Sequence, residues 1–337
     1  MMKDIVLPAE WEAQEFVQLV FPHKDTDWVE YLDDAIATFV EIAKTIAKYQ
    51  RCLIVAKNLQ YIKSLFKVHK NLIFVRLDSD DTWSRDFGGI TIKDGKSLKI
   101  LDFKFNGWGG KYLFKKDNKI TTQLKLKGIF KGYKHQSIPF ILEGGAIDSD
   151  GDGVLLTTSQ CLLNKNRNKF LSKNTIEKHL YEFFGLDKIL WLDYGSLVGD
   201  DTDSHIDTLA RFISTDTIVY QSCDDENNPN FAPLQKMYNQ LKTFKTKKGL
   251  NYKLVALPSI SPKYYQGEQL PATYVNFLII NGAVLVPIYN DTNDTKALEI
   301  FKKLFPKRDI ISIDCSILIK QHGSLHCVTM QYPKLKR

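Results

Sequence analysis

Side chains that could carry nucleophilic and acid–base chemistry lie in four short polar segments, which separate apolar runs of the sequence. The segments are residues 81–86, 142–145, 200–207 and 322–327. Together they supply a cysteine, a histidine and several carboxylates. If the fold brings the four segments to one place, this set suits covalent catalysis by a cysteine with the histidine as general acid and base.

Cys327 is the candidate nucleophile because it follows a turn that contains Gly323 and begins a predicted short strand, residues 327–330. A reactive cysteine needs a partner that favours its thiolate. On a strand the adjacent His326 would point away from Cys327, so we expect the distant His205 to be the general base. The other cysteines are expected to be small buried apolar side chains; they are Cys52, Cys161, Cys223 and Cys315.

His205 and Asp207 stand two residues apart on a predicted strand, residues 206–213. Side chains two apart on a strand point to the same face, so both would enter one cavity, while Ile206 and Thr208 face the other way. The alternative is a surface strand with two polar residues on its wet face.

Asp86, Glu143 and Asp207 would repel one another if they shared a cavity, and burying them unpaired is costly. Such a cluster makes sense if it awaits a cation. A planar guanidinium with its fork of donors suits two carboxylates. Lysine plus arginine exceed aspartate plus glutamate by 46 to 39, a net charge of +7. A basic protein that assembles an acidic pocket is expected to select a cationic substrate.

Two patterns resemble metal sites without fitting one. Residues 148–153 match the first half of a calcium-binding EF-hand loop, but the twelfth place is Ser159 and the flanks read as strands. We expect a hairpin turn there instead. His322 and His326 have metal-ligand spacing for a helix, but Gly323 argues against a helix and no further ligands are evident. The sequence therefore predicts no metal.

The elements that must position these segments alternate between short apolar strands and amphipathic helices, which predicts an α/β protein. Apolar residues at helical spacing predict a helix over 28–49, and buried strands are expected at 52–56 and 71–77. A helix, a strand, a polar loop and a second strand recur three times. Weaker copies are expected within 98–158 and 231–288. Such repetition predicts a ring or propeller of α/β units, and without a linker we treat 1–337 as a single domain.

The composition narrows the class of protein. The hydrophobic fraction is 44% and the charged fraction 25%, as in ordinary globular proteins. The lysines are spread along the chain, so nucleic-acid binding is not predicted. The five cysteines include no CxxC pair, which argues against disulfides. The start has no signal-peptide core and residues 274–289 are too short and polar to span a membrane. We expect a cytoplasmic protein, and a homo-oligomer is compatible with the sequence.

Six segments, in family order, resemble the agmatine deiminases, a group that includes the bacterial peptidyl-arginine-deiminase-like proteins of the guanidino-modifying pentein superfamily. They are residues 8–11, 83–86, 143–145, 155–167, 202–207 and 323–327. The resemblance runs from residue 8 to about residue 333. The chain departs from the family at 322–324, where three glycines are usual, at Ser204 and at 87–89. These departures concern the shape of the pocket more than its chemistry.

The resemblance implies a five-bladed α/β propeller of ββαβ-type units around a central active site. It also implies hydrolysis of the guanidinium of agmatine to N-carbamoylputrescine and ammonia, without metal or organic cofactor. Cys327 matches the family nucleophile and His205 the general acid/base. Asp86 and Asp207 match the carboxylates that bind the guanidinium, and Glu143 matches the acid beside the histidine.

The far end of agmatine is an ammonium, for which Trp83, Trp11 and Asp81 are the candidate partners. The alternative substrate is peptidyl-arginine or free arginine, which would give citrulline. Arg85 could pair with the carboxylate of free arginine, but we expect it to form a structural ion pair. Two other classes remain as alternatives: a basic protein that binds nucleic acid, and a Cys-His hydrolase of amides.

Overall fold

A computed structural model of the chain describes residues 5–68 and 70–334. Five sheets share one plan: two antiparallel strands, then a helix, then a third strand parallel to the second. This is the ββαβ unit that the sequence predicted. In chain order the strands are β5 (Ile90–Asp94), β6 (Ser97–Lys104), β7 (Tyr133–Ile141); β8 (Ile147–Ser149), β9 (Val154–Thr158), β10 (Lys188–Leu192); β11 (Ala210–Ser214), β12 (Thr217–Gln221), β13 (Lys253–Leu257); β16 (Leu278–Ile280), β17 (Ala283–Ile288), β18 (Asp309–Asp314); and β19 (Thr329–Pro333), β2 (Gln14–Val20), β3 (Arg51–Ala56).

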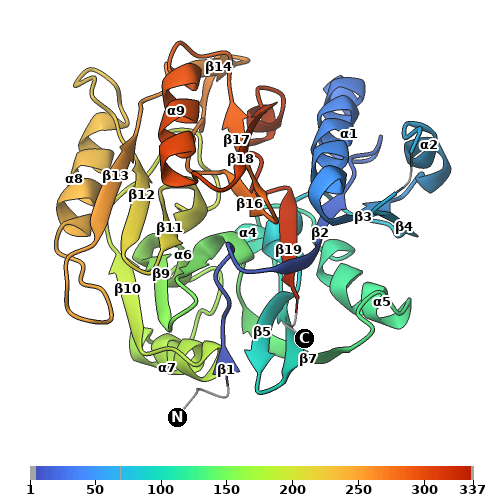
Figure 1. Cartoon of the computed structure of the whole chain (residues 1–337), viewed down its shortest axis with the longest axis horizontal. Helices are drawn as coiled ribbons and strands as arrows, with labels where there is room; N and C mark the ends of the chain where they lie inside the picture. The colour runs from blue at the N-terminus through green and yellow to red at the C-terminus, as the bar shows by residue number, and fades with distance from the viewer. Residues whose placement is uncertain (1–4, 69, 335–337) are drawn as a thin grey trace.

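The last unit is built from both ends of the described chain, because β19 pairs antiparallel with β2 while β2 pairs in parallel with β3. The longest helix of each unit lies between the second and third strands, and these helices stand at the periphery around the strands (Figure 1). They are α5 (Ile120–Leu126), α7 (Lys173–Phe184), α8 (Phe231–Leu241), α9 (Asp294–Leu304) and α1 (Leu32–Tyr49). The arrangement agrees with the predicted five-bladed α/β propeller.

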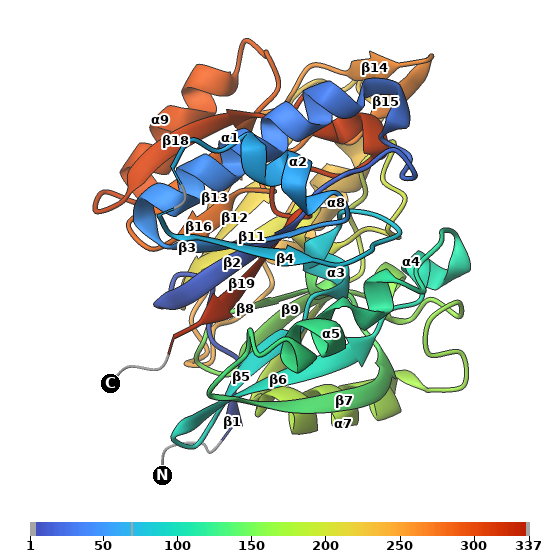
Figure 2. The same cartoon turned by 90° about the vertical axis from the view of Figure 1, so that its right-hand side faces the viewer.

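Shorter elements extend or connect the units. β4 pairs with β3, β1 pairs with β5, and β14 and β15 form a hairpin of their own. α3 and α4 lie on the same side of the sheets in the turned view (Figure 2). These elements are β1 (Ile5–Val6), β4 (Leu72–Arg76), β14 (Lys263–Tyr265), β15 (Glu268–Leu270), α2 (Leu59–Ser64), α3 (Ser84–Phe87), α4 (Gly107–Gly110), α6 (Ser159–Leu162), and the 3-10 helices η1 (Val29–Tyr31), η2 (Asp117–Lys119), η3 (Gly144–Ala146), η4 (Ile206–Thr208) and η5 (Leu318–Gln321).

The helix predicted over 28–49 from the spacing of apolar residues is present in the structure, but its first turn differs. Its apolar stripe is buried against the sheets, including Phe39 and Ile46, and two aspartates in its first turn favour the positive end of the helix dipole. The α-helix itself begins only at Leu32, because the preceding turn is η1. The strands predicted at 52–56 and 71–77 correspond to β3 and β4. No helix in the described residues is long and apolar enough to cross a membrane.

The connections between consecutive units, and not those within a unit, bring the polar segments together. Five connections do so: β4 to β5, β7 to β8, β10 to β11, β13 to β16, and β18 to β19. Three of them contain α3, η3 and η4. The 3-10 helix η3 contacts both α3 and η4, and α3 also contacts β19. The prediction that the loops converge is therefore confirmed.

Two local predictions were wrong. The strand predicted over 206–213 begins only at Ala210, and His205 instead precedes η4. In the polar segment, side chains accept hydrogen bonds from main-chain N–H groups that would otherwise pair with a neighbouring strand. Asp200 accepts from the Ser204 N–H at 2.7 Å, and Thr202 accepts from the His205 N–H at 3.2 Å. Such local bonds favour a turn over a strand.

Likewise, Cys327 does not begin a strand. It lies in a turn in which the Val328 N–H donates to the Ser324 carbonyl at 3.3 Å, and β19 begins at Thr329. A third prediction is confirmed: β8 and β9 are antiparallel, so residues 148–153 form a hairpin turn.

Candidate active site

A pocket leads from the surface to Cys327. Its described lining comes from three connections between units and from two connections within units. It consists of Asp27, Asp81, Trp83, Asp86, Trp108, Tyr112, Asp201, Thr202, Gln321, His322, Gly323 and Cys327. Asp86 lies in α3, and His205 and Asp207 lie at η4. Four of the five connections thus supply the residues predicted from the sequence, and the fifth supplies Asn276, which was not predicted.

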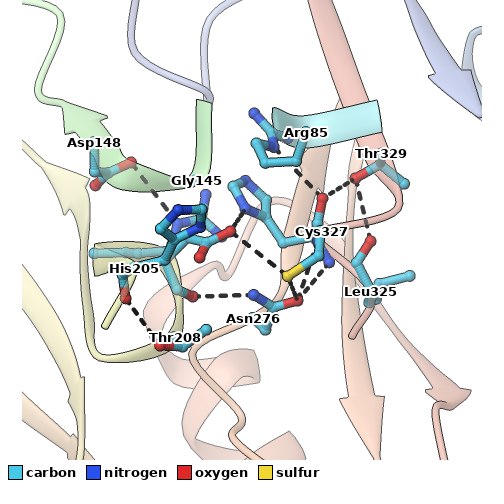
Figure 3. A network of polar contacts seen from close by, with 12 residues as sticks. Arg85, Gly145, Asp148, His205, Thr208, Asn276, Leu325, Cys327 and Thr329 are labelled. Carbon is cyan, nitrogen blue, oxygen red and sulfur yellow. Dashed lines mark hydrogen bonds and ion pairs between the residues drawn. The ribbon is translucent and has the colours of Figure 1, made fainter. Parts of the chain in front are cut away.

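Cys327 lies beside Asn276 (Figure 3) and close to Asp207. Its Sγ is 3.4 Å from Oδ1 of Asn276 and 3.9 Å from Oδ2 of Asp207, and its N–H is 3.3 Å from the same Asn276 oxygen. Burial, followed by the negative charges of Asp207 and Asp86, raises the pKa of the Cys327 thiol well above its usual value. Without a cation in the pocket, the sulfur is therefore protonated.

His205 is buried beside the Cys161 thiol. Neither ring nitrogen makes a contact with hydrogen-bond geometry among the described residues. Its Nδ1 is 3.6 Å from Oδ1 of Asp86. Burial alone would lower the pKa of His205, but the neighbouring charges, Asp86 first among them, and the Cys161 thiol raise it well above its usual value. An imidazolium with free N–H groups can donate a proton to a leaving group.

Asp86 and Asp207 differ in what holds them. Oδ1 of Asp86 accepts from the Gly145 N–H at 3.0 Å, and Oδ2 accepts from the Trp108 indole at 2.9 Å. Burial raises the pKa of Asp86 to about 6. The charge of His205 opposes this rise, and the charge of Asp207 adds to it. Burial would also raise the pKa of Asp207, but a hydrogen bond from His326 and nearby positive charge lower it. Oδ1 of Asp207 is buried and has no described partner.

Gly145 permits these groups to approach one another. A Cβ atom on it would lie 2.6 Å from Nδ1 of His205, 2.8 Å from Oδ1 of Asp86 and 3.2 Å from Oδ2 of Asp207. Any side chain at this position would displace at least one of them. The glycine pair 144–145 is therefore part of the site because the absence of side chains there leaves room for the neighbouring groups.

Glu143 is fully buried and paired with Arg167. Nε of Arg167 is 2.9 Å from Oε1 and 3.0 Å from Oε2 of Glu143, while Nη1 contacts Asp203 at 2.6 Å. Within residues 5–68 and 70–334, the group Glu143, Cys161 and His205 could offer ligand atoms to a metal, all within 4.8 Å of one another. The Arg167 guanidinium on both Glu143 oxygens opposes a second cation there.

The mouth of the pocket is acidic and aromatic. Asp81 accepts hydrogen bonds from the indoles of Trp28 at 2.8 Å and Trp83 at 2.9 Å. Asp201 accepts from the hydroxyl of Tyr112 at 2.8 Å. Asp81 thus fixes Trp83 as well as lining the pocket, and none of the described lining residues is a lysine or an arginine.

Trp11 lies elsewhere. It is not among the described residues that line this pocket, and its carbonyl accepts from Arg308 at 2.8 Å. We therefore do not carry it into the proposed substrate site. Arg85 does form the expected structural ion pair: it is buried, with Nη2 3.7 Å from Oε2 of Glu10.

The site has three buried residues that the sequence analysis did not place in it: Asn276, His326 and Glu10. Asn276 could have been anticipated from position, since it precedes the first strand of a unit as Cys327 and Asp207 do. His326 was considered only as a general base and set aside. Glu10 lies in the segment 8–11 that resembles the family, but no role was predicted for it.

Comparison with known proteins identifies the family. The profile of the Porphyromonas-type peptidyl-arginine deiminases matches residues 6–333. A protein named agmatine deiminase from Pseudomonas aeruginosa is 31% identical over 97% of this chain and 95% of its own. A solved agmatine deiminase of C. jejuni with substrate bound is 42% identical, with a TM-score of 0.93 over 99% of this chain and 97% of that one.

More distant structures share the fold. An agmatine deiminase of Enterococcus faecalis is 27% identical, with a TM-score of 0.90 over 99% of this chain and 97% of that one. DDAH from Pseudomonas aeruginosa is only 10% identical but has a TM-score of 0.52 over 95% of this chain and all of that one. This last likeness concerns the pentein fold alone. The chain belongs to the Porphyromonas-type peptidyl-arginine deiminase family.

Proposed function

We propose that the protein is an agmatine deiminase, which hydrolyses the guanidinium of agmatine to N-carbamoylputrescine and ammonia. The carrying observation is the pocket itself: four aspartates, at 27, 81, 86 and 201, line it, no described lining residue is a lysine or arginine, and it ends at Cys327. A substrate with a positive charge at each end suits this lining. The names of the relatives in Pseudomonas, C. jejuni and Enterococcus support the same substrate.

In the proposed reaction, Asp86 and Asp207 bind the guanidinium N–H groups and present its carbon to the sulfur. The bound cation favours the thiolate, so the Cys327 thiol releases its proton to solvent despite its high pKa in the free enzyme. The thiolate attacks the guanidinium carbon and forms a tetrahedral adduct. His205 donates its proton to one nitrogen, ammonia leaves, and a covalent S-alkylthiouronium remains on Cys327.

The second half of the reaction returns the enzyme to its starting state. His205, now neutral, takes a proton from water, and the hydroxide adds to the thiouronium carbon. The carbon–sulfur bond then breaks and the hydroxyl proton of the adduct passes to the departing sulfur, which releases the ureido product and the Cys327 thiol. Glu143, held by Arg167, contributes negative charge that supports the imidazolium form of His205.

Free arginine is the less favourable substrate because its carboxylate would enter a pocket mouth with Asp27 and Asp201 and no basic lining residue. Arg85 cannot compensate, since it is buried beside Glu10 on the far side of the site. The name of the family includes peptidyl-arginine, whose side chain carries the same guanidinium without a second positive charge. We keep arginyl peptides as the alternative substrate.

The test is a colorimetric assay for ureido product on purified protein with agmatine, arginine and an arginyl peptide in parallel, and with Cys327→Ala as the blank. We expect product from agmatine with wild-type protein and none from the variant. Higher kcat/KM for the peptide would replace agmatine with the alternative. No product from any of the three, with a folded protein by circular dichroism, would refute the proposal.

We further propose that residues 1–337 act as one catalytic domain, because the site draws on connections from all five units. A cytoplasmic location is also proposed: all five cysteines are free, which suits a reducing compartment. Homo-oligomerisation stays a prediction, and sedimentation of the purified protein would decide it.

A further inference from the structure

His326, the neighbour of the proposed nucleophile, is buried between two carboxylates. Its Nδ1 is 2.7 Å from Oδ2 of Asp207, and its Nε2 is 2.7 Å from Oε2 of Glu10. The side chain is only 2% exposed. Both ring nitrogens are thus engaged, which leaves none for the reacting atoms and separates the task of His326 from that of His205.

Glu10 is itself held firmly from the other side. Oε2 of Glu10 is 2.8 Å from Nη2 of Arg211, and Oε1 accepts from the Ile279 N–H at 2.7 Å. Arg211 is fully buried, donates to the Phe277 carbonyl and stacks its guanidinium over the Phe277 ring. Burial would raise the pKa of Glu10, but Arg211 and His326 lower it well below its usual value, so the carboxylate is ionised.

The proton positions follow from these contacts. An ionised carboxylate only accepts hydrogen bonds, so Nδ1 of His326 carries the proton that it shares with Asp207. A proton must also lie between Nε2 and Glu10, because two lone pairs 2.7 Å apart would repel each other. Burial and the cations Arg211 and Arg85 oppose this second proton and lower the pKa of His326, whereas the two flanking carboxylates favour it. The imidazole therefore joins two buried carboxylates as a rigid spacer.

These contacts fix the orientation of the Asp207 carboxylate. Oδ2 is occupied by His326, while the buried Oδ1 has no described partner. The main-chain carbonyl of Asp207 is fixed as well, since it accepts from the amide of Asn276 at 3.2 Å. The carboxylate is thereby held in one rotation, with one oxygen free to accept an N–H from a guanidinium.

We propose that His326 is a positioning residue for Asp207: braced by Glu10 and Arg211, it holds Oδ2 of Asp207 so that Oδ1 faces the bound guanidinium. The inference rests on the proposed function, because it assumes a cation at Asp207. Charge-assisted hydrogen bonds are the stronger class, and a carboxylate free to rotate would lose part of this contact.

Two substitutions separate the two contacts of His326. Asparagine places its amide nitrogen near the position of Nδ1 and can still donate to Asp207, whereas glutamine reaches toward the position of Nε2 and Glu10. We expect His326→Gln to lower kcat/KM for agmatine about 10- to 100-fold, chiefly through KM, and His326→Asn to retain about tenfold more activity than His326→Gln. Equal losses in the two variants would overturn the proposal, because a purely structural histidine predicts them.

A second cavity permits chemical rescue. Glu10, Arg85, His326 and Met330 are among its lining residues, so removal of the imidazole opens a space that this cavity adjoins. We expect added imidazole to raise kcat/KM of His326→Gly several-fold and to leave Cys327→Ala inactive. Absence of rescue, with a folded variant, would count against the proposal.

A readout that needs no substrate keeps this inference separable from the proposed function. Cys327 is alkylated with 2-chloroacetamidine, an amidinium, and with neutral iodoacetamide, and intact mass reports both rates. We expect the ratio of the two rates to fall about tenfold in His326→Gln relative to His326→Asn. An unchanged ratio would refute the positioning role, whereas wild-type protein without ureido product would refute only the proposed function. If either variant fails to fold, the ratio measured with Glu10→Gln takes its place: a fall supports the role and no change refutes it.

Discussion

Gly145 and His205 approach so closely that a Cβ atom on the glycine would lie 2.6 Å from Nδ1 of the imidazole. Real Cβ atoms do not sit so near a ring nitrogen, so one of the two would have to move. The backbone of the η3 turn and the general acid/base proposed above are therefore packed as a single unit.

Gly145→Ala should abolish most activity while the fold persists. The methyl group displaces His205 or Asp86 by a few tenths of an ångström or more, and misplacement of reacting groups on this scale costs on the order of 100-fold in rate. We expect kcat for agmatine to fall by about that factor. Gly128→Ala is the control: an added Cβ meets nothing within 4 Å, but the φ of +76° strains the backbone, so this variant tests whether strain away from the site alone lowers kcat. It should leave kcat unchanged. Near wild-type turnover of Gly145→Ala would show that the reaction does not depend on the present position of the His205 side chain.

The acid side of the pH profile should report Asp86. Its pKa is raised to about 6, so the ionised form that binds the guanidinium predominates above pH 6 and is lost as the pH falls through that value. The profile of kcat/KM reflects groups of the free enzyme. We expect kcat/KM for agmatine to be half-maximal near pH 6. A midpoint near pH 4 would instead indicate an unperturbed carboxylate.

Cys327 should react slowly with neutral alkylating agents in the absence of substrate. Burial, Asp207 and Asp86 raise the pKa of the thiol well above its usual value, so the thiolate that attacks iodoacetamide is scarce at neutral pH. We expect the rate of inactivation by iodoacetamide to be still rising at pH 9. The Cys327→Ala protein, labelled under the same conditions, corrects for the other cysteines. A rate that reaches a plateau near pH 7 would mean that His205 already holds a thiolate in the free enzyme.

Loss of Arg167 should destabilise the fold. The pair with Glu143 is fully buried, and removal of one partner of a buried ion pair costs about 3–5 kcal/mol because the remaining charge is left uncompensated. We expect Arg167→Met to lower the free energy of unfolding in urea by that amount. The double variant Arg167→Met/Glu143→Gln removes both charges and should recover part of the loss. A single-variant effect below about 1 kcal/mol would show that other groups compensate Glu143.

Asp201 should contribute to recognition of the second charge of agmatine. It lines the mouth of the pocket and accepts a hydrogen bond from Tyr112. Asp201→Asn should raise KM for agmatine about fivefold and leave KM for butylguanidine, which lacks the ammonium, nearly unchanged, as expected for loss of one partly exposed ionic contact. Equal effects on the two substrates would place the ammonium elsewhere, and Asp27→Asn is then the next variant to measure.

Local pattern was sufficient for much of the fold. Helical spacing of apolar residues predicted α1 from about its first turn. The recurrence of a strand, a polar loop and a second strand predicted that the loops converge. Periodicity failed where side chains compete for main-chain hydrogens, as at His205, or where a tight turn replaces a strand, as at Cys327.

The sequence by itself determined the candidates for the chemistry: a cysteine, a histidine and three acids, each on a connection between units. Only the tertiary structure decided that Asn276 lies against Cys327, that Trp11 is outside the pocket, and that Glu10 reaches His326 across 316 positions of the chain. The reason is physical. Alternation and helical spacing in the sequence show which face of its own helix or strand a residue lies on. They do not show contacts between distant elements, which form only once β19 pairs with β2 and joins the two ends of the chain.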